Sequence, residues 1–179
     1  MTDLTFRPAT LADIDSLVVL VTSAYRGDVS KQGWTTEADM LDGQRIDPEV
    51  LRKDIERARS RIVIAERGRQ LLACAHVAEE DGAGYFGMFS VKPDLQGAGV
   101  GKALLAEAER IAAEEWRLPT MRMTVIDIRD ELIAFYSRRG YTRTGIKKPF
   151  PYGDERYGIP KRDDLRFEIL EKPLVGTGA

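Results

Sequence analysis

The amino-acid sequence predicts an α+β layer fold with the element order β-α-α-β-β-β-α-β-α-β-β. Three observations predict it: alternating segments typical of strands at both ends of the chain, three strand-like segments in quick succession near its middle, and helical spacing of apolar residues between them. The chain has 179 residues, of which 43% are hydrophobic, so it can bury one sizeable core. We therefore expect a single domain over residues 1–179.

The first third of the chain predicts one strand and two helices. Residues 4–7 alternate between apolar and polar side chains, as strands do. Thr10 and Asp13 form a capping-box pattern before an apolar-periodic segment, so a helix is expected to follow them. The glycine-containing stretch 27–47 predicts a loop that can include a short helix. A second helix is expected from Asp47-Pro48 to about residue 59.

The middle of the chain predicts an antiparallel meander. Strand-like segments cover residues 61–66, 70–79 and 84–91. Gly68 and the pair Asp81-Gly82 separate them, and both are turn signals. Because the connections are so short, each strand is expected to pair with the next one along the chain.

The second half predicts two amphipathic helices that alternate with strands. Each helix carries its apolar residues on one face and ends at a breaker, Pro119 or Gly140. The expected elements are a helix from Gly101, a strand over 120–126, a helix over 127–139, and final strands over 141–146 and 165–170. A Pro- and Gly-rich loop over 147–164 separates the last two strands.

Composition and charge exclude several classes of function. A formal charge of −2 and a pI near 5.6 provide no general cationic field for nucleic acid or a membrane surface. The apolar runs are shorter than the roughly 20 residues that a membrane helix needs, so a cytoplasmic protein is expected. Cys74 and His76 are the only residues of their kinds, which excludes an intramolecular disulfide and a Cys/His zinc cage. We expect no metal site and a buried packing role for Cys74.

The densest motif lies between the expected strand 84–91 and the helix that follows it. Gly97, Gly99 and Gly101 fall within five residues. Glycines allow main-chain N–H groups to turn toward one point, and a helix N-terminus adds partial positive charge, so this junction suits a diphosphate. A simple strand-to-helix turn is the alternative explanation.

Two familiar phosphate-binding motifs do not fit this segment. A nucleoside-triphosphate loop would need glycine where Gln96 stands and Ser or Thr where Ala103 stands. A dinucleotide G-x-G-x-x-G motif that begins at Gly97 would need glycine at Lys102. The pattern that does match is Q/R-x-x-G-x-G/A, at Gln96, Gly99 and Gly101.

With this motif in its strand and helix context, the sequence resembles the GNAT superfamily of N-acetyltransferases. The resemblance implies a three-layer fold with a mixed, mostly antiparallel central sheet, and acetyl-CoA as the acyl donor. It also implies that the strand before the motif binds the pantetheine arm through its main chain. The expected coenzyme-binding residues are Phe89, Ser90, Val91, Gln96, Gly97, Ala98, Gly99, Val100, Gly101 and Lys102. Lys102 is either a phosphate partner or simply solvated.

A second segment, residues 129–141, resembles the helix-then-glycine segment of the same family. The resemblance implies that Tyr136 lies beside the thioester sulfur as a general acid. Full proton transfer from a tyrosine to a free thiolate would be uphill by roughly 2 kcal/mol, so hydrogen bonding during thiolate expulsion is the expected role. The alternative is a core aromatic, because Leu132 and Ile133 share its helix face. Arg129 stands where the family commonly has Asn, and it is expected to bind a coenzyme phosphate or the acceptor.

A base that accepts the amine proton does not stand out. Glu37, His76, Glu79 and Asp127 are candidates, and bulk water is an equal contender. His76 lies in an apolar strand, where a structural histidine is the commoner finding. We leave the base unassigned.

The family resemblance places the acceptor between residues 25–45 and the loop 147–164. The candidate acceptor-binding residues are Arg26, Trp34, Glu37 and Arg45. Our hypothesis is that Arg26 or Arg45 holds an acceptor carboxylate while Trp34 covers its apolar part. The alternative is a core tryptophan with solvated arginines. Aromatic residues of the loop 147–164 could cover a pocket or form a dimer contact, so a homodimer stays open.

The sequence therefore predicts an acetyl-CoA-dependent N-acetyltransferase that acts on a primary amine, with a small molecule as the expected acceptor. Direct attack is expected because Cys74 has no base nearby in the sequence. Two alternatives remain: a noncatalytic acyl-CoA sensor on the same fold, and a protein or peptide N-acetyltransferase.

Overall fold

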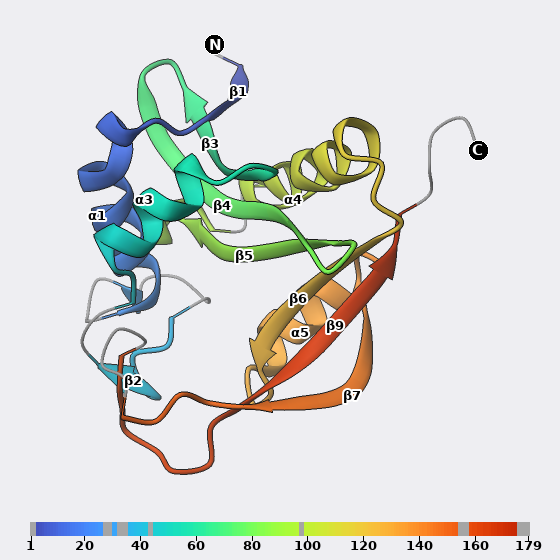
Figure 1. The fold of residues 1–179 in the computed structure, drawn as a ribbon. Helices are drawn as coiled ribbons and strands as arrows, with labels where there is room; N and C mark the ends of the chain where they lie inside the picture. Colours follow the sequence, from blue (N-terminus) through green and yellow to red (C-terminus); the bar gives the residue numbers. More distant parts are fainter. Residues whose placement is uncertain are drawn as a thin grey trace.

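The central sheet of this computed structural model contains seven strands in the order β1-β3-β4-β5-β6-β9-β7 (Figure 1). The structure describes residues 3–26, 30–31, 36–42, 45–96, 99–153 and 158–174. The strands of this sheet, in chain order, are β1 (Leu4–Pro8), β3 (Ser60–Arg67), β4 (Gln70–Glu80), β5 (Ala83–Val91), β6 (Thr120–Ile126), β7 (Thr142–Pro149) and β9 (Arg166–Pro173).

In the described part of the chain, four α-helices pack against the sheet, and with them the predicted element order is confirmed. They are α1 (Ile14–Tyr25), α3 (Pro48–Glu56), α4 (Val100–Arg110) and α5 (Asp130–Ser137). Apart from one- to two-turn 3₁₀ and π segments and a two-residue strand pair, the order is β-α-α-β-β-β-α-β-α-β-β. The capping box at Thr10 and Asp13 is also confirmed, with the Thr10 N–H donating to the Asp13 carboxylate over 2.8 Å.

The helices form two layers on opposite faces of the sheet. Buried residues of α1 and α3 pack with Ile62, Ile64 and Cys74 on one face. Buried residues of α4 and α5 pack with Val63, Phe86 and other strand residues on the opposite face. The strand β4 is buried along most of its length because helices cover both of its faces. The fold is therefore a three-layer α+β arrangement around a mixed sheet, as expected.

The strands β5 and β6 run parallel but pair only at their first residues. The pairing joins Gly84 to Met121 and Tyr85 to Arg122. Beyond these pairs the strands part, and Figure 1 shows β6 and β9 turning away from β5. The β4–β5 register shifts near Cys74, and Met88 has a φ of +52°, so a bulge bends β5 at this point. The edge of β5 after Tyr85 is consequently left without a neighbouring strand among the described residues.

Several boundaries differ from the sequence-based expectation. The helix expected from residue 127 begins at Asp130. Before it, the chain forms a turn in which the Arg129 N–H donates to the Ile126 carbonyl over 3.0 Å. The expected loop 147–164 is also partly ordered. The strand β7 continues to Pro149, and β8 (Ile159–Pro160) pairs with β2 (Leu41–Asp42) in a small second sheet. That second sheet joins the two segments that were expected to surround the acceptor.

Leu41 also belongs to a third, smaller apolar cluster. The other buried members of this cluster are Ile126, Phe150 and Leu165. It therefore ties the segment before α3 to the end of β6 and to the loop after β7. In the described part of the chain, no helix is long and apolar enough to cross a membrane.

Candidate active site

The start of α4 lies directly after β5 and presents main-chain donors. Gly99 is its N-cap, with a φ of +85° that glycine adopts without strain, and no side chain caps the helix. The Ala103 N–H bonds the Gly99 carbonyl at 3.1 Å, so the N–H groups of residues 100–102 lack helical partners. This arrangement suits an anion such as a diphosphate. Lys102 is exposed on the same turn.

Close packing of α4 on β5 requires glycine at position 101. A Cβ at Gly101 would lie 2.7 Å from Cζ of Phe89 and 3.4 Å from Cγ2 of Val91. Gln96 Nε2 donates to the Val91 carbonyl over 3.0 Å, which fastens the motif to the end of β5. The structure thus brings the motif residues and β5 into one continuous surface, while Gly97 and Ala98 lie outside the described residues.

The end of β5 carries two further polar contacts. Ser90 Oγ donates to the Met88 carbonyl over 3.0 Å, across the bulge. The Tyr25 hydroxyl, at the end of α1, donates to the Phe89 carbonyl. Because a carbonyl has two lone pairs, Phe89 can still accept a second hydrogen bond. The coenzyme-binding roles of Phe89, Ser90 and Val91 remain predictions.

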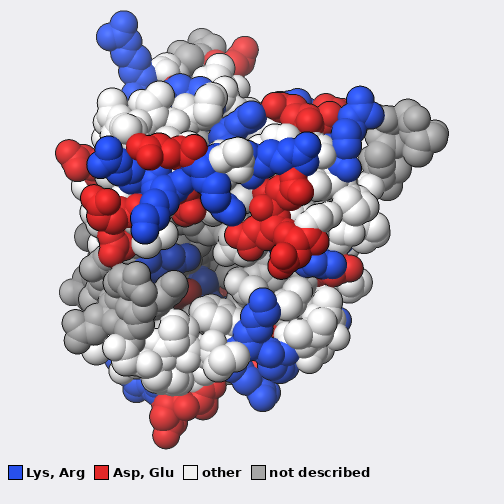
Figure 2. All heavy atoms as spheres, in the orientation of Figure 1, with Lys and Arg blue, Asp and Glu red and all other residues white. Residues whose placement is uncertain are grey.

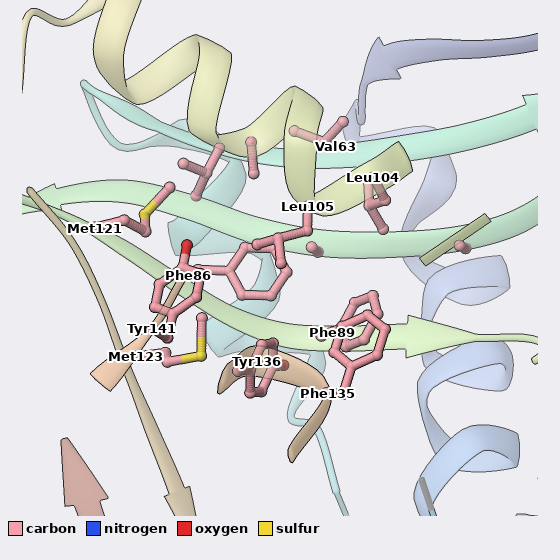
Figure 3. Packing of buried hydrophobic residues seen from close by; sticks show 14 of the residues in the cluster. Val63, Phe86, Phe89, Leu104, Leu105, Met121, Met123, Phe135, Tyr136 and Tyr141 are labelled. Atoms are coloured by element: carbon pink, nitrogen blue, oxygen red, sulfur yellow. The ribbon is translucent and has the colours of Figure 1, made fainter. Parts of the chain in front are cut away.

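Tyr136 lies on the buried face of α5, under β5. Figure 3 shows its ring with Phe89 and Phe135 on one side and Tyr141 on the other. The ring centroids lie 6.2 Å from Phe89, 5.4 Å from Phe135 and 5.9 Å from Tyr141. The ring is therefore part of the core, as the alternative explanation expected. Among the described residues, no group forms a hydrogen bond with its hydroxyl, which remains available to a ligand.

The environment of Tyr136 keeps its hydroxyl protonated. Burial raises the pKa of Tyr136 well above its ordinary value of 10, and the neighbouring Tyr25 raises it further. The positive charges of Arg129 and Arg45 lower this pKa in part. Both guanidinium groups therefore lie within electrostatic reach of the tyrosine. Its catalytic role remains a prediction. At neutral pH the group is a neutral hydroxyl that can donate a hydrogen bond.

Arg26, Glu37 and Arg129 form a buried ion cluster. Arg26 donates to Oε1 of Glu37, and Arg129 Nη1 donates to Oε2 over 3.0 Å. Burial alone would raise the pKa of Glu37, but Arg129, Arg45 and Arg26 lower it below its ordinary value. Glu37 is consequently an ionised carboxylate that accepts a hydrogen bond from one arginine on each of its oxygens. Arg129, expected at the coenzyme, lies in this cluster, and any contact with the coenzyme remains a prediction.

Arg45 contacts the same Tyr25 ring as Arg129 does. Its guanidinium carbon lies 4.8 Å from the centre of the Tyr25 ring, and that of Arg129 lies 5.5 Å from it. No carboxylate among the described residues forms an ion pair with Arg45. We call Arg26, Glu37, Arg45 and Arg129 the inner cluster. It combines three guanidinium groups with one carboxylate.

A pocket of about 230 Å³ opens beside the inner cluster, at the place where β5 and β6 part. Arg26, Glu37 and Arg45 form its charged wall. The remaining lining residues are Leu41, Tyr85, Gly87, Met88, Thr124, Ile126, Phe150 and Phe167. Figure 2 shows this face of the molecule hollowed near its middle, with basic and acidic side chains inside the hollow.

The pocket brings together most of the acceptor-binding candidates. Arg26, Glu37 and Arg45 line it, whereas Trp34 lies outside the described residues. Of the aromatic residues in the loop after β7, Phe150 lines the pocket. Tyr152 instead holds the loop, where its hydroxyl donates to the Arg162 carbonyl over 3.0 Å.

Sequence reasoning missed Tyr25, Tyr85 and Thr124. Tyr25 links the inner cluster to Phe89, and Tyr85 and Thr124 form the walls of the pocket on β5 and β6. The position of Tyr25 beside Arg26 at the end of an amphipathic helix is the single sequence signal for it. Nothing in the local pattern marks the other two, because their role depends on the parting of the strands.

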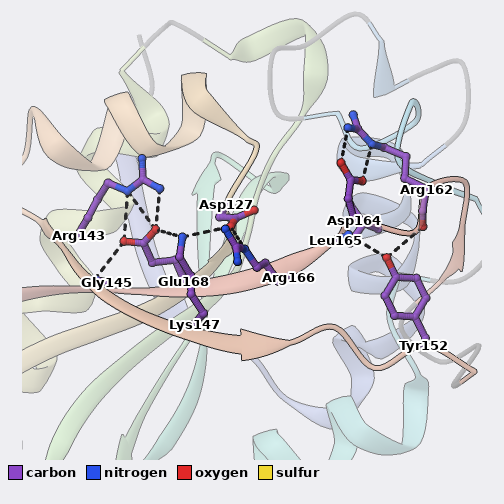
Figure 4. A network of polar contacts seen from close by, with 10 residues as sticks. All are labelled: Asp127, Arg143, Gly145, Lys147, Tyr152, Arg162, Asp164, Leu165, Arg166 and Glu168. Carbon is purple, nitrogen blue, oxygen red and sulfur yellow. Dashed lines mark hydrogen bonds and ion pairs between the residues drawn. The ribbon is translucent and has the colours of Figure 1, made fainter.

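The candidate bases are all committed to other contacts. Glu37 is held by two arginines, and Glu79 pairs with Arg59. Asp127 pairs with Lys147 and Arg166 at the β7 side of the sheet (Figure 4). The paired cations lower the pKa of Glu37 and of Asp127 and so weaken these two carboxylates as proton acceptors.

His76 is a buried structural histidine. Burial lowers its pKa to about 4, and Arg57 contributes to the shift. Ser60 Oγ donates to the Asp54 carbonyl over 2.6 Å, so it accepts from Nε2 of His76 at 2.8 Å. This geometry assigns the Nε2–H tautomer to His76. Its ring packs edge-on against Tyr85 with a centroid distance of 5.8 Å and lines a further pocket together with Arg45.

Cys74 is buried on β4, and burial raises the pKa of its thiol to about 12. A thiol in that state is a poor nucleophile at neutral pH. Among the described residues, no group of three or more His, Cys, Asp or Glu side chains is arranged to hold a metal ion.

Comparison with known proteins finds a matching family model for the middle of the chain. Residues 58–143 match the family model described as acetyltransferase (GNAT) domain. This range spans β3, β4, β5, the glycine motif, α4, β6 and α5, which together carry the site described above. Residues 58–143 therefore form a GNAT-type acetyltransferase domain. A search of curated protein sequences finds no significant match.

Solved structures show the same fold. The ribosomal-protein-S18-alanine N-acetyltransferase of Escherichia coli superposes with a TM-score of 0.71 at 15% identity, covering 98% of this chain and 97% of the other. An N-acetyltransferase of Staphylococcus aureus Mu50 gives 0.72 at 11% identity, with 96% and 98% covered. Nourseothricin acetyltransferase gives 0.56 at 22% identity, with 66% and 67% covered. These neighbours act on different kinds of acceptor, so they do not identify the acceptor of this protein.

Proposed function

We propose that the protein transfers an acetyl group from acetyl-CoA to the primary amine of a small molecule by direct attack. One observation carries the proposal: the anion-binding helix start and the ring of Tyr136 both lie against Phe89 of β5, and a pocket opens along the same strand where it parts from β6. An acyl transfer needs these three parts, which are a donor site, a group that stabilises the leaving thiolate, and an acceptor site.

The start of α4 and the edge of β5 fit the donor. The uncapped N–H groups of residues 100–102 and the helix dipole favour a diphosphate. The unpaired edge of β5 can bind the amides of a pantetheine arm as an added strand would. Gly101 supports this fit, because a side chain at that position would displace Phe89 from the surface of β5.

Tyr136 stabilises the leaving group. As the amine forms its bond to the acetyl carbon, the carbon–sulfur bond breaks and a thiolate departs. The neutral hydroxyl of Tyr136 donates a hydrogen bond to that thiolate, and its raised pKa keeps it a donor throughout the neutral range. The positive charges of Arg129 and Arg45 also act on this hydroxyl, where they offset part of the effect of burial on its pKa. The proton of the amine leaves through water, since the candidate bases are committed elsewhere.

Direct transfer is supported by the state of Cys74. A covalent acetyl-enzyme would need a nucleophile, and the buried thiol with a pKa of about 12 does not supply a thiolate at neutral pH. The small volume of the pocket and its cover by Phe150 and Phe167 favour a small molecule over a peptide chain.

The test is to compare thiol release by wild type and Tyr136→Phe, with acetyl-CoA and a panel of amino acids, polyamines, aminoglycosides and short peptides. We expect Tyr136→Phe to lower kcat by roughly 100-fold, as the loss of one transition-state donor does. Tyr141→Phe is the matched control, because Tyr141 is buried in the same aromatic cluster but donates to Glu109. Its kcat should stay within about threefold of wild type.

Isothermal titration with acetyl-CoA separates the outcomes. Unchanged binding by Tyr136→Phe with reduced kcat supports the catalytic role. Turnover that persists at the wild-type rate would contradict it. Binding by wild type without thiol release from any amine would favour a noncatalytic acyl-CoA sensor, and release with peptides alone would favour a protein acetyltransferase.

A further inference from the structure

Among the described residues, the charged wall of the acceptor pocket contains two arginines, Arg26 and Arg45, and one carboxylate, that of Glu37. Arg26 and Arg129 share the carboxylate of Glu37, one on each oxygen. Arg45 also lines the pocket, and no carboxylate among the described residues pairs with it. Its charged head lies over the Tyr25 ring, which provides a face but no anion. A guanidinium in a small, partly enclosed pocket is well suited to a carboxylate, which it can bind through two parallel hydrogen bonds.

We propose that the acceptor is an amino-acid-type molecule, a primary amine that also carries a carboxylate, and that Arg45 binds this carboxylate. The inference rests on the proposed acetyl transfer and adds the chemical class of the acceptor. It also assigns different roles to Arg26 and Arg45, between which the sequence alone does not choose. Arg26 maintains the pocket through Glu37, whereas Arg45 is the specificity-determining residue.

The position of Arg45 orients such an acceptor toward the donor. Arg45 lies against Tyr25, and Tyr25 donates to the Phe89 carbonyl on the edge of β5 that the donor is proposed to use. An amine a few bonds away from a carboxylate held at Arg45 therefore lies near the opening between β5 and β6. Tyr85 and Thr124 form the walls of that opening.

The rest of the pocket fits the body of a small amino acid. Leu41, Ile126, Phe150 and Phe167 provide an apolar wall opposite the charged one. The volume of about 230 Å³ is below the range of roughly 300–1,000 Å³ that is typical of drug-sized ligands. An amino-acid-sized acceptor with an apolar side chain matches both the volume and the lining.

The positive charge of the inner cluster has two consequences for the acceptor. Polyamines and aminoglycosides carry several positive charges, and the guanidinium of Arg45 in the pocket repels them. The same field disfavours the ammonium form of a bound amine and so lowers its pKa. A larger share of the bound acceptor is then the neutral nucleophile, which explains how the reaction can proceed although no side chain stands out as a base.

The experiment uses three acceptor mixtures with acetyl-CoA and follows thiol release. The first contains the common amino acids together with β-alanine and γ-aminobutyrate, the second contains their carboxamides, and the third contains the amines that lack the carboxyl group. The proteins are wild type, Arg45→Gln, Arg45→Lys and the control Arg52→Gln. Arg52 is exposed on α3 and pairs only with Glu56 on the same helix among the described residues, so its removal changes the charge of the surface but not of the pocket.

We expect wild type to prefer the amino-acid mixture by at least about tenfold in kcat/KM. Arg45→Gln should lower kcat/KM for the preferred amino acid by roughly 10- to 100-fold more than it lowers kcat/KM for the carboxamide. Arg45→Lys should retain part of the preference, because it keeps the charge and loses the bidentate geometry. Arg52→Gln should behave as wild type. The preference is a ratio within one variant, so partial loss of folded protein cancels.

Equal or faster turnover of the carboxamide or amine mixture overturns the proposal and leaves the acetyltransferase activity intact. Absence of turnover with all three mixtures, by protein that binds acetyl-CoA, also overturns it. Failure of wild type to bind acetyl-CoA overturns the proposed function itself, so the two failures are distinguished by the binding measurement.

Discussion

The inner cluster and the charged network at the β7 edge of the sheet use the same residue types in different surroundings. In the edge network, Glu168 accepts from Arg143 and Lys147 at 2.6 Å each, and Asp127 pairs with Lys147 and Arg166 (Figure 4). The side chains of the cations Arg143, Lys147 and Arg166 are 47%, 32% and 59% exposed. In the inner cluster the side chains of Arg26 and Arg129 are 4% and 7% exposed.

The difference in exposure decides what each group of charges does. When an ion pair is broken at the surface, the remaining ion is rehydrated and little free energy is lost. When a buried pair is broken, the remaining charge stays without water and the loss is large. Breaking an ion pair of the inner cluster is therefore expected to cost more than breaking one of the edge network. The position of the inner cluster beside the pocket supports its proposed role toward the acceptor.

The largest expected effect is that of Glu37→Gln. This change leaves Arg26 and Arg129 buried without their carboxylate, so the free energy of unfolding should fall by about 3–5 kcal/mol. Urea denaturation followed by circular dichroism measures it. A loss below about 1 kcal/mol would mean that water reaches the cluster and that it does not differ from the edge network.

An intermediate effect is expected for Glu168→Gln. The carboxyl is buried, but its partners are exposed enough to be rehydrated, so the loss at pH 7 should be about 1–2 kcal/mol. The same denaturation experiment measures it. A loss as large as that of Glu37→Gln would remove the distinction between the two groups of charges.

The pH dependence of stability gives a second measurement at Glu168. Hydrogen bonds from Arg143 and Lys147 lower its pKa from 4.5 to about 2. Because the unfolded chain binds this proton more readily, the stabilisation is complete above about pH 4.5 and is lost as the pH falls toward 2. Glu168→Gln should therefore show a flatter decline of stability between pH 5 and pH 2 than wild type. An identical decline would contradict the assigned pairing.

The smallest effect is expected at an exposed pair. Arg122 and Glu171 bridge β6 and β9 at 2.9 Å, and their side chains are 45% and 39% exposed. Glu171→Gln should change the free energy of unfolding by less than about 1 kcal/mol, and the change should shrink further in 1 M salt. A larger, salt-insensitive loss would show that exposure alone does not explain the comparison.

Much of the fold could be predicted from local sequence patterns. The strands of the meander, the two helices after it and their apolar faces follow from periodicity and turn residues, because these depend on neighbours along the chain. The glycine motif could be located for the same reason, since Gly99 and Gly101 are needed by the local backbone and by the helix that packs on β5. The predicted ends of helices were less accurate. One hydrogen bond of a turn, from the Arg129 N–H to the Ile126 carbonyl, precedes α5, which therefore begins three residues later than expected.

By itself, the sequence determined the order of elements, the family resemblance and the set of charged residues near the acceptor. The tertiary structure decided how those charges are shared. Arg129 meets Glu37 across 92 positions of the chain, and Arg45 is the arginine of the inner cluster that has no carboxylate partner among the described residues. It also decided that β9 lies between β6 and β7 and that β5 and β6 part after two residue pairs. Periodicity does not encode such long-range contacts, because they depend on which surfaces meet once the layers pack.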